Sequence, residues 1–110
     1  MILVSANFCQ QILEIENFAK KVIIAQSNAL IKIAEFIDVS FAEAVKLIYK
    51  SKGRVVVTGV GKSAIIANKI AATLNSTGTP ALFMHAADAI HGDLGLVQKD
   101  DVLICISTVS

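Results

Sequence analysis

The stretch Arg54–Ser63 places the tightest limits on what this chain can fold into. It contains the run Val55–Val57, and consecutive β-branched residues are typical of a strand that is buried on both faces. Gly59 and Gly61 follow at once, and glycine permits the tight turn that must connect such a strand to the next element. The stretch therefore predicts a buried strand that ends in a glycine turn.

A helix is expected directly after this turn, over residues 64–76, with Ser63 as its N-cap. The start of a helix presents free backbone N–H groups and the positive end of the helix dipole. Lys62 adds a full positive charge at the same place. The turn is thus a candidate site for a phosphate or a carboxylate.

The composition excludes several classes of protein. The chain has 110 residues, 55% of them hydrophobic, which fits at most one globular domain. The net charge of +1 gives no reason to expect nucleic acid or an anionic membrane as a partner. Charged residues interrupt each apolar stretch before it reaches the length of a membrane span, and Met1–Val4 lacks the features of a signal peptide. Cys9 and Cys105 lack a metal-ligand spacing, so we expect a reducing, cytoplasmic setting, with Cys105 buried in a strand.

The first half of the chain has helical periodicity. Apolar residues recur at helical spacing over residues 8–37, although Gln26–Asn28 interrupts them, which predicts one long kinked helix or two helices. Ser40–Glu43 has the pattern of a capping box and opens a further helix that Gly53 closes. We therefore divide the chain into an N-terminal helical region, residues 1–52, and an α/β region, residues 53–110.

The second half alternates strands with helical segments. Strands are expected at 54–59, 81–85 and 102–107, with a helix at 64–76, a short helical turn at 86–90 and a loop at 91–95. The helix at 64–76 is expected to bury three residues: Ile66, Ile70 and Leu74. This order predicts a three-layer α/β fold with a parallel, flavodoxin-like or Rossmann-like sheet in the order 2-1-3. Three such strands leave apolar edges, so we expect the chain to be part of a larger domain.

The order 2-1-3 places the switch point between the C-terminal ends of the first and third strands. The glycine turn and the hydroxyl-bearing residues after the third strand would line one crevice there. These residues are Lys62, Ser63, Ser107, Thr108 and Ser110.

Two nucleotide-binding motifs compete as interpretations of this turn. A Walker A motif needs glycine at position 56, which is valine, and that excludes a P-loop. The pattern Gly59-x-Gly61-x-x-Ala64 fits a relaxed dinucleotide fingerprint, but His85 stands where the ribose-binding acid belongs. A turn that only packs the helix on the strand remains an alternative.

Three motifs in register resemble a known family: residues 53–63, residues 76–80 (Ser-Thr-Gly-Thr-Pro) and residues 91–95 (His-Gly-Asp-Leu-Gly). They are similar to the sugar isomerase (SIS) domain of arabinose 5-phosphate isomerases, over about residues 13–107. The resemblance implies interconversion of ribulose 5-phosphate and arabinose 5-phosphate through an enediol, in the synthesis of 3-deoxy-D-manno-octulosonate (Kdo), a lipopolysaccharide precursor. It implies no required cofactor and a homo-oligomer, with a tetramer favoured.

The resemblance also assigns roles to residues. It implies that Lys62 and His91 are catalytic and that His85 contacts the substrate and can take a zinc ion. The substrate-binding set comprises Gly61, Ser63, Gly78, Thr79, His85, His91 and Ser107. Gly78 and Thr79 enter their strand at the wrong end of the sheet for this crevice, so they would serve a neighbouring subunit.

The chain departs from the family pattern at two places. Ala64 replaces a usual glycine, and Ser107 is followed by Thr108–Ser110 where the family has a longer phosphate-binding loop. The family's catalytic carboxylates lie beyond this point, so we expect these 110 residues to be inactive alone. A non-catalytic SIS module that binds a sugar phosphate is the alternative. Such regulators carry a basic helix-turn-helix domain, which is missing here.

Overall fold

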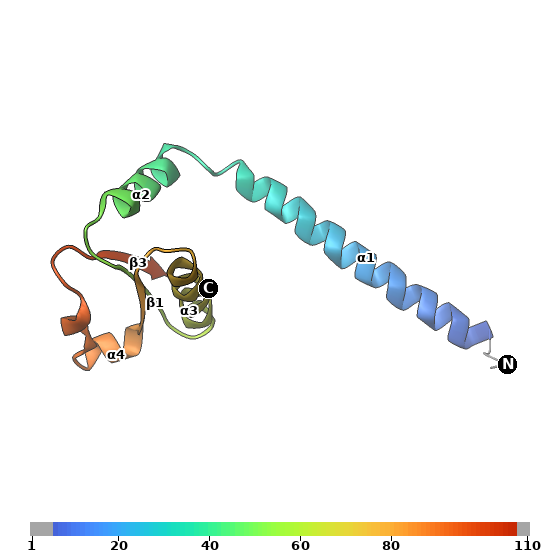
Figure 1. Ribbon diagram of the computed structural model, residues 1–110. Helices are drawn as coiled ribbons and strands as arrows, with labels where there is room; N and C mark the ends of the chain where they lie inside the picture. The colour runs from blue at the N-terminus through green and yellow to red at the C-terminus, as the bar shows by residue number, and fades with distance from the viewer. Residues whose placement is uncertain (1–5, 108–110) are drawn as a thin grey trace. The chain divides into compact units, whose positions relative to one another are not determined.

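The computed structural model describes residues 6–107 (Figure 1). The chain divides into two compact units after Phe41, and each is described by itself. The boundary that we expected at residue 52 stays a prediction.

The first unit is dominated by one helix, α1 (Ala6–Ala34). The single-helix form of the prediction is confirmed, although α1 ends three residues before position 37. Gln26–Asn28 lies inside α1, because polar residues interrupt an apolar stripe without breaking the backbone hydrogen bonds of a helix. No helix among the described residues is long and apolar enough to cross a membrane.

The next helix, α2 (Val39–Lys50), begins one residue before the expected capping box. Its cap is Asp38, whose Oδ1 accepts a hydrogen bond of 2.9 Å from the backbone N–H of Ser40. Ser40 was therefore wrongly predicted as the cap. A carboxylate at the N-cap satisfies a free N–H and also interacts favourably with the helix dipole.

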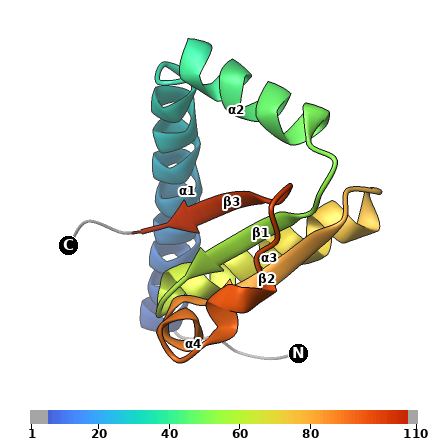
Figure 2. The same ribbon diagram turned by 90° about the vertical axis from the view of Figure 1, so that its left-hand side faces the viewer.

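The sheet has the predicted order, β2-β1-β3, with all strands parallel (Figure 2). Its strands are β1 (Val55–Gly59), β2 (Ala81–His85) and β3 (Val102–Ile106). All five residues of β1 are buried, as the valine run predicted. The α/β class and the parallel sheet are confirmed.

One face of the sheet is covered by α3 (Lys62–Ser76), which lies behind the strands in Figure 2. Ala67 and Ala71 pack against Val55 and Val57, and small side chains allow this close approach of helix and strand. Ile66 was expected in the core but is 51% exposed. Ile70 and Leu74 are partly buried, as flanks of the alanine stripe rather than its centre.

The other face carries the connection from β2 to β3, through α4 (Ala86–Ile90) and the 3₁₀ helix η1 (Asp93–Leu96). A right-handed crossover that runs back across the sheet must use this second face. Side chains that alternate toward it are buried, Val56 and Thr58 on the central strand β1 and Met84 on β2. The 3₁₀ helix was missed, since residues 91–95 were expected to be a loop.

The edge strand β3 is less covered than expected. Cys105 is exposed and Leu103 is 44% exposed, so the predicted burial of Cys105 is wrong. Both cysteines of the chain are unpaired. The apolar run therefore indicated the strand correctly but not its exposure, although the predicted order 2-1-3 already placed this strand at an edge.

Candidate functional site

The strand register aligns the ends of the three strands. Gly59 lies opposite His85 on one side and Ile106 on the other, so these residues form one row at the C-terminal edge of the sheet. The glycine turn, α4 and Ser107 all follow directly from this row. Most of the predicted site residues therefore belong to one edge: Gly61, Lys62, Ser63, His85, His91 and Ser107.

The turn after β1 depends on both of its glycines, for different reasons. A Cβ on Gly59 would lie 2.8 Å from the carbonyl carbon of Ser63, so this position needs glycine because the helix start approaches the strand closely. Gly61 has φ 62° and ψ −130°, a backbone conformation that residues with a Cβ rarely adopt. The turn is thus a tight and sterically specified connection.

The cap of α3 differs from the prediction. Gly61 is the N-cap, no side chain caps the helix, and Ser63 lies inside the first turn with 2% of its surface exposed. The expectation that Ser63 caps the helix is wrong, because the glycine turn is shorter than assumed and α3 begins two residues earlier. Free N–H groups still head the helix, since the first amides of any α-helix lack intrahelical acceptors.

Lys62 is the first residue of α3, and its side chain is exposed. Within residues 6–107 its ammonium group makes no hydrogen bond or ion pair. A cation at the positive end of a helix dipole is unfavourable by itself. An anion bound at this turn would relieve that cost.

His85 ends β2 and caps α4. Its Nδ1 accepts a hydrogen bond of 3.1 Å from the backbone N–H of Ala87, and its ring meets that of Phe83 edge-on at 6.4 Å. An acceptor at Nδ1 places the proton of the neutral ring on Nε2, which then is a hydrogen-bond donor. His85 is therefore suited to donate to a substrate oxygen.

A zinc ion at His85 has little support in the described residues. Nδ1 is occupied, and no group of three His, Cys, Asp or Glu side chains that could hold a metal ion forms among the residues searched. Structural and catalytic zinc sites ordinarily use at least three protein ligands. The described residues alone do not supply such a set of ligands, and zinc at His85 stays a prediction.

His91 closes α4 at the same edge of the sheet. It is the C-cap residue, with its backbone N–H 3.0 Å from the carbonyl oxygen of Asp88, and its side chain is exposed. Gly92 follows with φ 118°, which turns the chain toward η1. Ser107 is exposed directly after β3, whereas Thr108 and Ser110 lie outside the described residues.

Gly78 and Thr79 lie at the opposite edge, as the topology predicted. They precede Ala81, which pairs with Val55 at the N-terminal end of the sheet. Both line a cavity of about 320 Å³ with residues of α2 and the start of β1. Within one chain they do not join the residues of the glycine turn.

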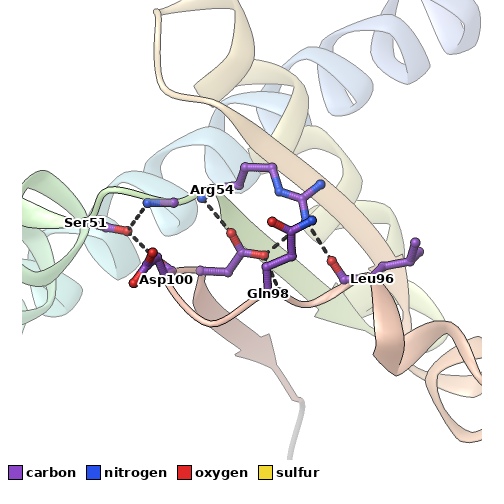
Figure 3. Close-up of polar contacts among 7 residues, drawn as sticks. Ser51, Arg54, Leu96, Gln98 and Asp100 are labelled. Carbon is purple, nitrogen blue, oxygen red and sulfur yellow. Dashed lines mark hydrogen bonds and ion pairs between the residues drawn. The ribbon is translucent and has the colours of Figure 1, made fainter.

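A polar cluster lies at this N-terminal edge of the sheet (Figure 3), and it was not predicted from the sequence. The Nη2 of Arg54 donates to the carbonyl oxygen of Leu96 at 2.6 Å and lies 3.1 Å from Oδ2 of Asp101. Asp101 also accepts from the backbone N–H of Gln98 and of Arg54, each at 2.8 Å. These N–H groups, together with the guanidinium, lower the pKa of Asp101 to about 2.

A signal for this cluster does exist in the sequence. Arg54 is the only arginine of the chain, and it directly precedes the central strand. Asp101 directly precedes β3, the strand that pairs with β1 in parallel. Oppositely charged residues that precede paired parallel strands lie side by side, so the topology alone would have predicted the pair.

Comparison with known proteins points to one family. A model of the SIS domain matches residues 47–109. The arabinose 5-phosphate isomerase KdsD of Pseudomonas aeruginosa is 44% identical over 88% of this chain, and the isomerase GutQ of Escherichia coli is 43% identical over 83%. An E. coli protein solved in complex with arabinose 5-phosphate matches with a TM-score of 0.70 and 46% identity over 84% of this chain.

The chain spans part of these proteins. It covers 30% of the length of KdsD, 28% of that of GutQ and 51% of the solved E. coli chain. The shared part contains the parallel sheet and the glycine turn, which lie within the matched family region.

Proposed function

The chain belongs to the SIS domain family, and we propose from this premise that the protein isomerises arabinose 5-phosphate and ribulose 5-phosphate. One observation carries the proposal: an E. coli protein with 46% identity to this chain was solved in complex with arabinose 5-phosphate. The names of the curated relatives support the same reaction. By the same analogy, the product would feed Kdo and lipopolysaccharide synthesis.

The glycine turn supplies the binding of the phosphate group in this proposal. Lys62 is the first residue of α3, so its positive charge belongs to the same turn as the first amides of the helix, and both favour an anion. Gly61 leaves space for the approach of an oxygen, because no described atom beyond its chain neighbours lies within 4 Å of where its Cβ would be. Ser63 and Ser107 border the same edge and complete the proposed phosphate contacts.

The sugar end of the substrate then meets the two histidines. Aldose–ketose isomerisation moves a proton between C1 and C2 while the carbonyl oxygen is polarised. His85 offers an Nε2–H donor, and His91 has an exposed imidazole at the same edge. We assign polarisation and proton transfer to His91 and substrate orientation to His85, while Lys62 stabilises the reacting substrate through its charge at the phosphate.

The placement of Gly78 and Thr79 supports an oligomer. These residues lie at the sheet edge away from the turn, so they can contact substrate only in a neighbouring subunit. We propose a homo-oligomer, with a tetramer favoured, in the cytoplasm and without a required cofactor. The two unpaired cysteines are consistent with a reducing compartment.

The test is a kinetic comparison of variants of the full-length protein. Lys62→Ala should lower kcat/KM for ribulose 5-phosphate by at least about 100-fold, because one charged group at the phosphate is lost. Lys69→Ala is the matched control, since Lys69 is an exposed lysine of the same helix, and it should stay within about twofold.

The outcome also separates the alternative function. Saturable binding of arabinose 5-phosphate without turnover in the wild-type protein would contradict the isomerase and favour a non-catalytic SIS module. An equal loss of kcat/KM in the Lys62→Ala and Lys69→Ala variants would contradict the role assigned to the glycine turn.

A further inference from the structure

The segment that carries His91 is held at both ends. At its start, the backbone N–H of Ala87 bonds to the ring of His85, the last residue of β2. At its end, the carbonyl oxygen of Leu96 accepts the 2.6 Å hydrogen bond from Arg54 (Figure 3). Between these points α4 and η1 pack mainly on each other, and α4 also packs on β2.

This segment has little burial of its own to fix it. None of the residues of α4 is buried, and Ile90 and Leu94 expose 85% and 60% of their surfaces. Gly92 precedes η1 and Gly95 lies within it, and glycine restricts the backbone less than any other residue. A stretch with few buried contacts opens locally at a small cost in free energy. The anchor at Leu96 therefore matters for where His91 lies.

Arg54 is itself held in a fixed orientation. Its backbone N–H bonds to Oδ1 of Asp101 and its Nη2 lies 3.1 Å from Oδ2, so one carboxylate binds both ends of the residue. The carboxylate has only 2% of its side chain exposed, against 35% for Arg54. Ser51 bonds to the carbonyl oxygen of Asp100 and to the N–H of Gly53, which ties the same two chain segments together.

We infer that Arg54 is a positioning residue, which holds the segment 86–96 and thereby places His91 at the C-terminal edge of the sheet. The chain of contacts runs from the start of β3 through Asp101 and Arg54 to Leu96, and then along η1 to His91. Arg54 touches no substrate in this arrangement. Its effect on catalysis rests on the proposed isomerase function. The hold of Arg54 on residues 86–96, which we call the tether, does not rest on it.

The test combines amide hydrogen exchange with kinetics on the full-length protein. Arg54→Met should raise exchange in residues 86–96 by about tenfold, the effect of losing one charge-assisted hydrogen bond, without raising it in β1. Arg54→Lys keeps the cation and should recover part of the protection. Lys52→Met removes a charge from a nearby exposed lysine and should leave exchange unchanged.

Kinetics on the same variants test the link to His91. Arg54→Met should lower kcat by about tenfold while KM changes by less than about threefold, because the loss concerns the orientation of a catalytic group and not binding. These assays are run well below the melting temperature of each variant, so that a loss of stability does not lower kcat.

The outcomes separate the two proposals. Unchanged exchange in residues 86–96, or an equal rise in β1, would overturn the tether. Raised exchange with an unchanged kcat would overturn the positioning role. A wild-type protein that does not turn over arabinose 5-phosphate would refute the isomerase, while exchange would still decide the tether.

Discussion

At the scale of single residues, the turn after β1 contains two glycines that are needed for different reasons. Gly59 has no room for a side chain, whereas Gly61 has room but an unfavourable φ of 62°. The first cost is an overlap with the backbone of Ser63, and the second is conformational strain.

This difference predicts a ranking of alanine substitutions. Gly59→Ala should destabilise the protein by about 2–3 kcal/mol through overpacking, and Gly61→Ala by about 1–2 kcal/mol through strain. Gly95→Ala is the control, because its Cβ meets nothing and its φ is not positive, and it should change stability by less than about 0.5 kcal/mol. Urea unfolding measures all three, and a cost at Gly95 equal to that at Gly59 would contradict the ranking.

Thr58 has the one buried side-chain polar atom without a hydrogen-bond partner among the residues described, its Oγ1. Burial of an unpaired hydroxyl costs free energy that an apolar group of the same shape does not incur. Thr58→Val should therefore stabilise the protein by about 1 kcal/mol in chemical unfolding.

Thr73→Val provides the comparison for Thr58. The hydroxyl of Thr73 bonds to the carbonyl oxygen of Lys69 and is exposed, so its loss should not stabilise the protein. A destabilised Thr58→Val variant would show that this hydroxyl has a partner in solution.

At the scale of elements, Asp101 joins the start of β3 to the start of β1. Its pKa is lowered to about 2 from 3.8, so the unfolded chain binds the proton more readily than the folded one. The stabilisation is complete above about pH 4 and should be lost as the pH falls through about 2.

Asp101→Asn tests this pH dependence. The difference in unfolding free energy between the wild type and the variant should be constant at neutral pH and shrink as the pH is lowered from about 4 toward 2. Asp100→Asn, at the exposed neighbouring residue, serves as the control. A difference that does not change with pH would mean that Asp101 acts through shape and not charge.

The elements also show which features can be read from sequence. The strands and their order were predicted because the valine run and the strand–helix–strand pattern restrict a parallel sheet to few topologies. Caps were misplaced, at Ser40 and at Ser63, since the start of a helix depends on which nearby group meets the free N–H groups. The prediction that Ile66 is buried was wrong, because the alanines of α3 allow the closest packing on β1 and alanine gives only a weak periodic signal in a sequence.

The candidate site was predicted in part for the same reason. Its edge follows from topology, so Lys62 and Ser107 were expected at one edge of the sheet, and both lie there, whereas His85 was assigned to the site only through the family resemblance. Arg54 was not identified. Its pairing with Asp101 could have been predicted from the topology, but its hydrogen bond to the backbone carbonyl oxygen of Leu96, 42 residues away, could not, because a carbonyl group leaves no mark in a sequence.

At the scale of the whole molecule, the separation of Thr79 from Lys62 predicts complementation between subunits. A mixture of Lys62→Ala and Thr79→Val proteins, unfolded and reassembled together, should regain about a quarter of wild-type activity, since half of randomly formed pairs hold one intact shared site. Each variant reassembled alone is the control and should stay inactive. If verified mixed oligomers recover no activity, Lys62 and Thr79 do not form one site shared between subunits.

The position of the central strand has a consequence for synthesis on the ribosome. β1 is made before both of its neighbours, and β1, α3 and β2 are complete at His85, whereas β3 begins at Val102, 17 residues later (102 − 85). At ordinary elongation rates one edge of β1 then stays unpaired for about 1–3 s. During that interval the nascent chain presents a valine-rich edge, which is the moment when a chaperone, or a second nascent chain, can compete with its own third strand.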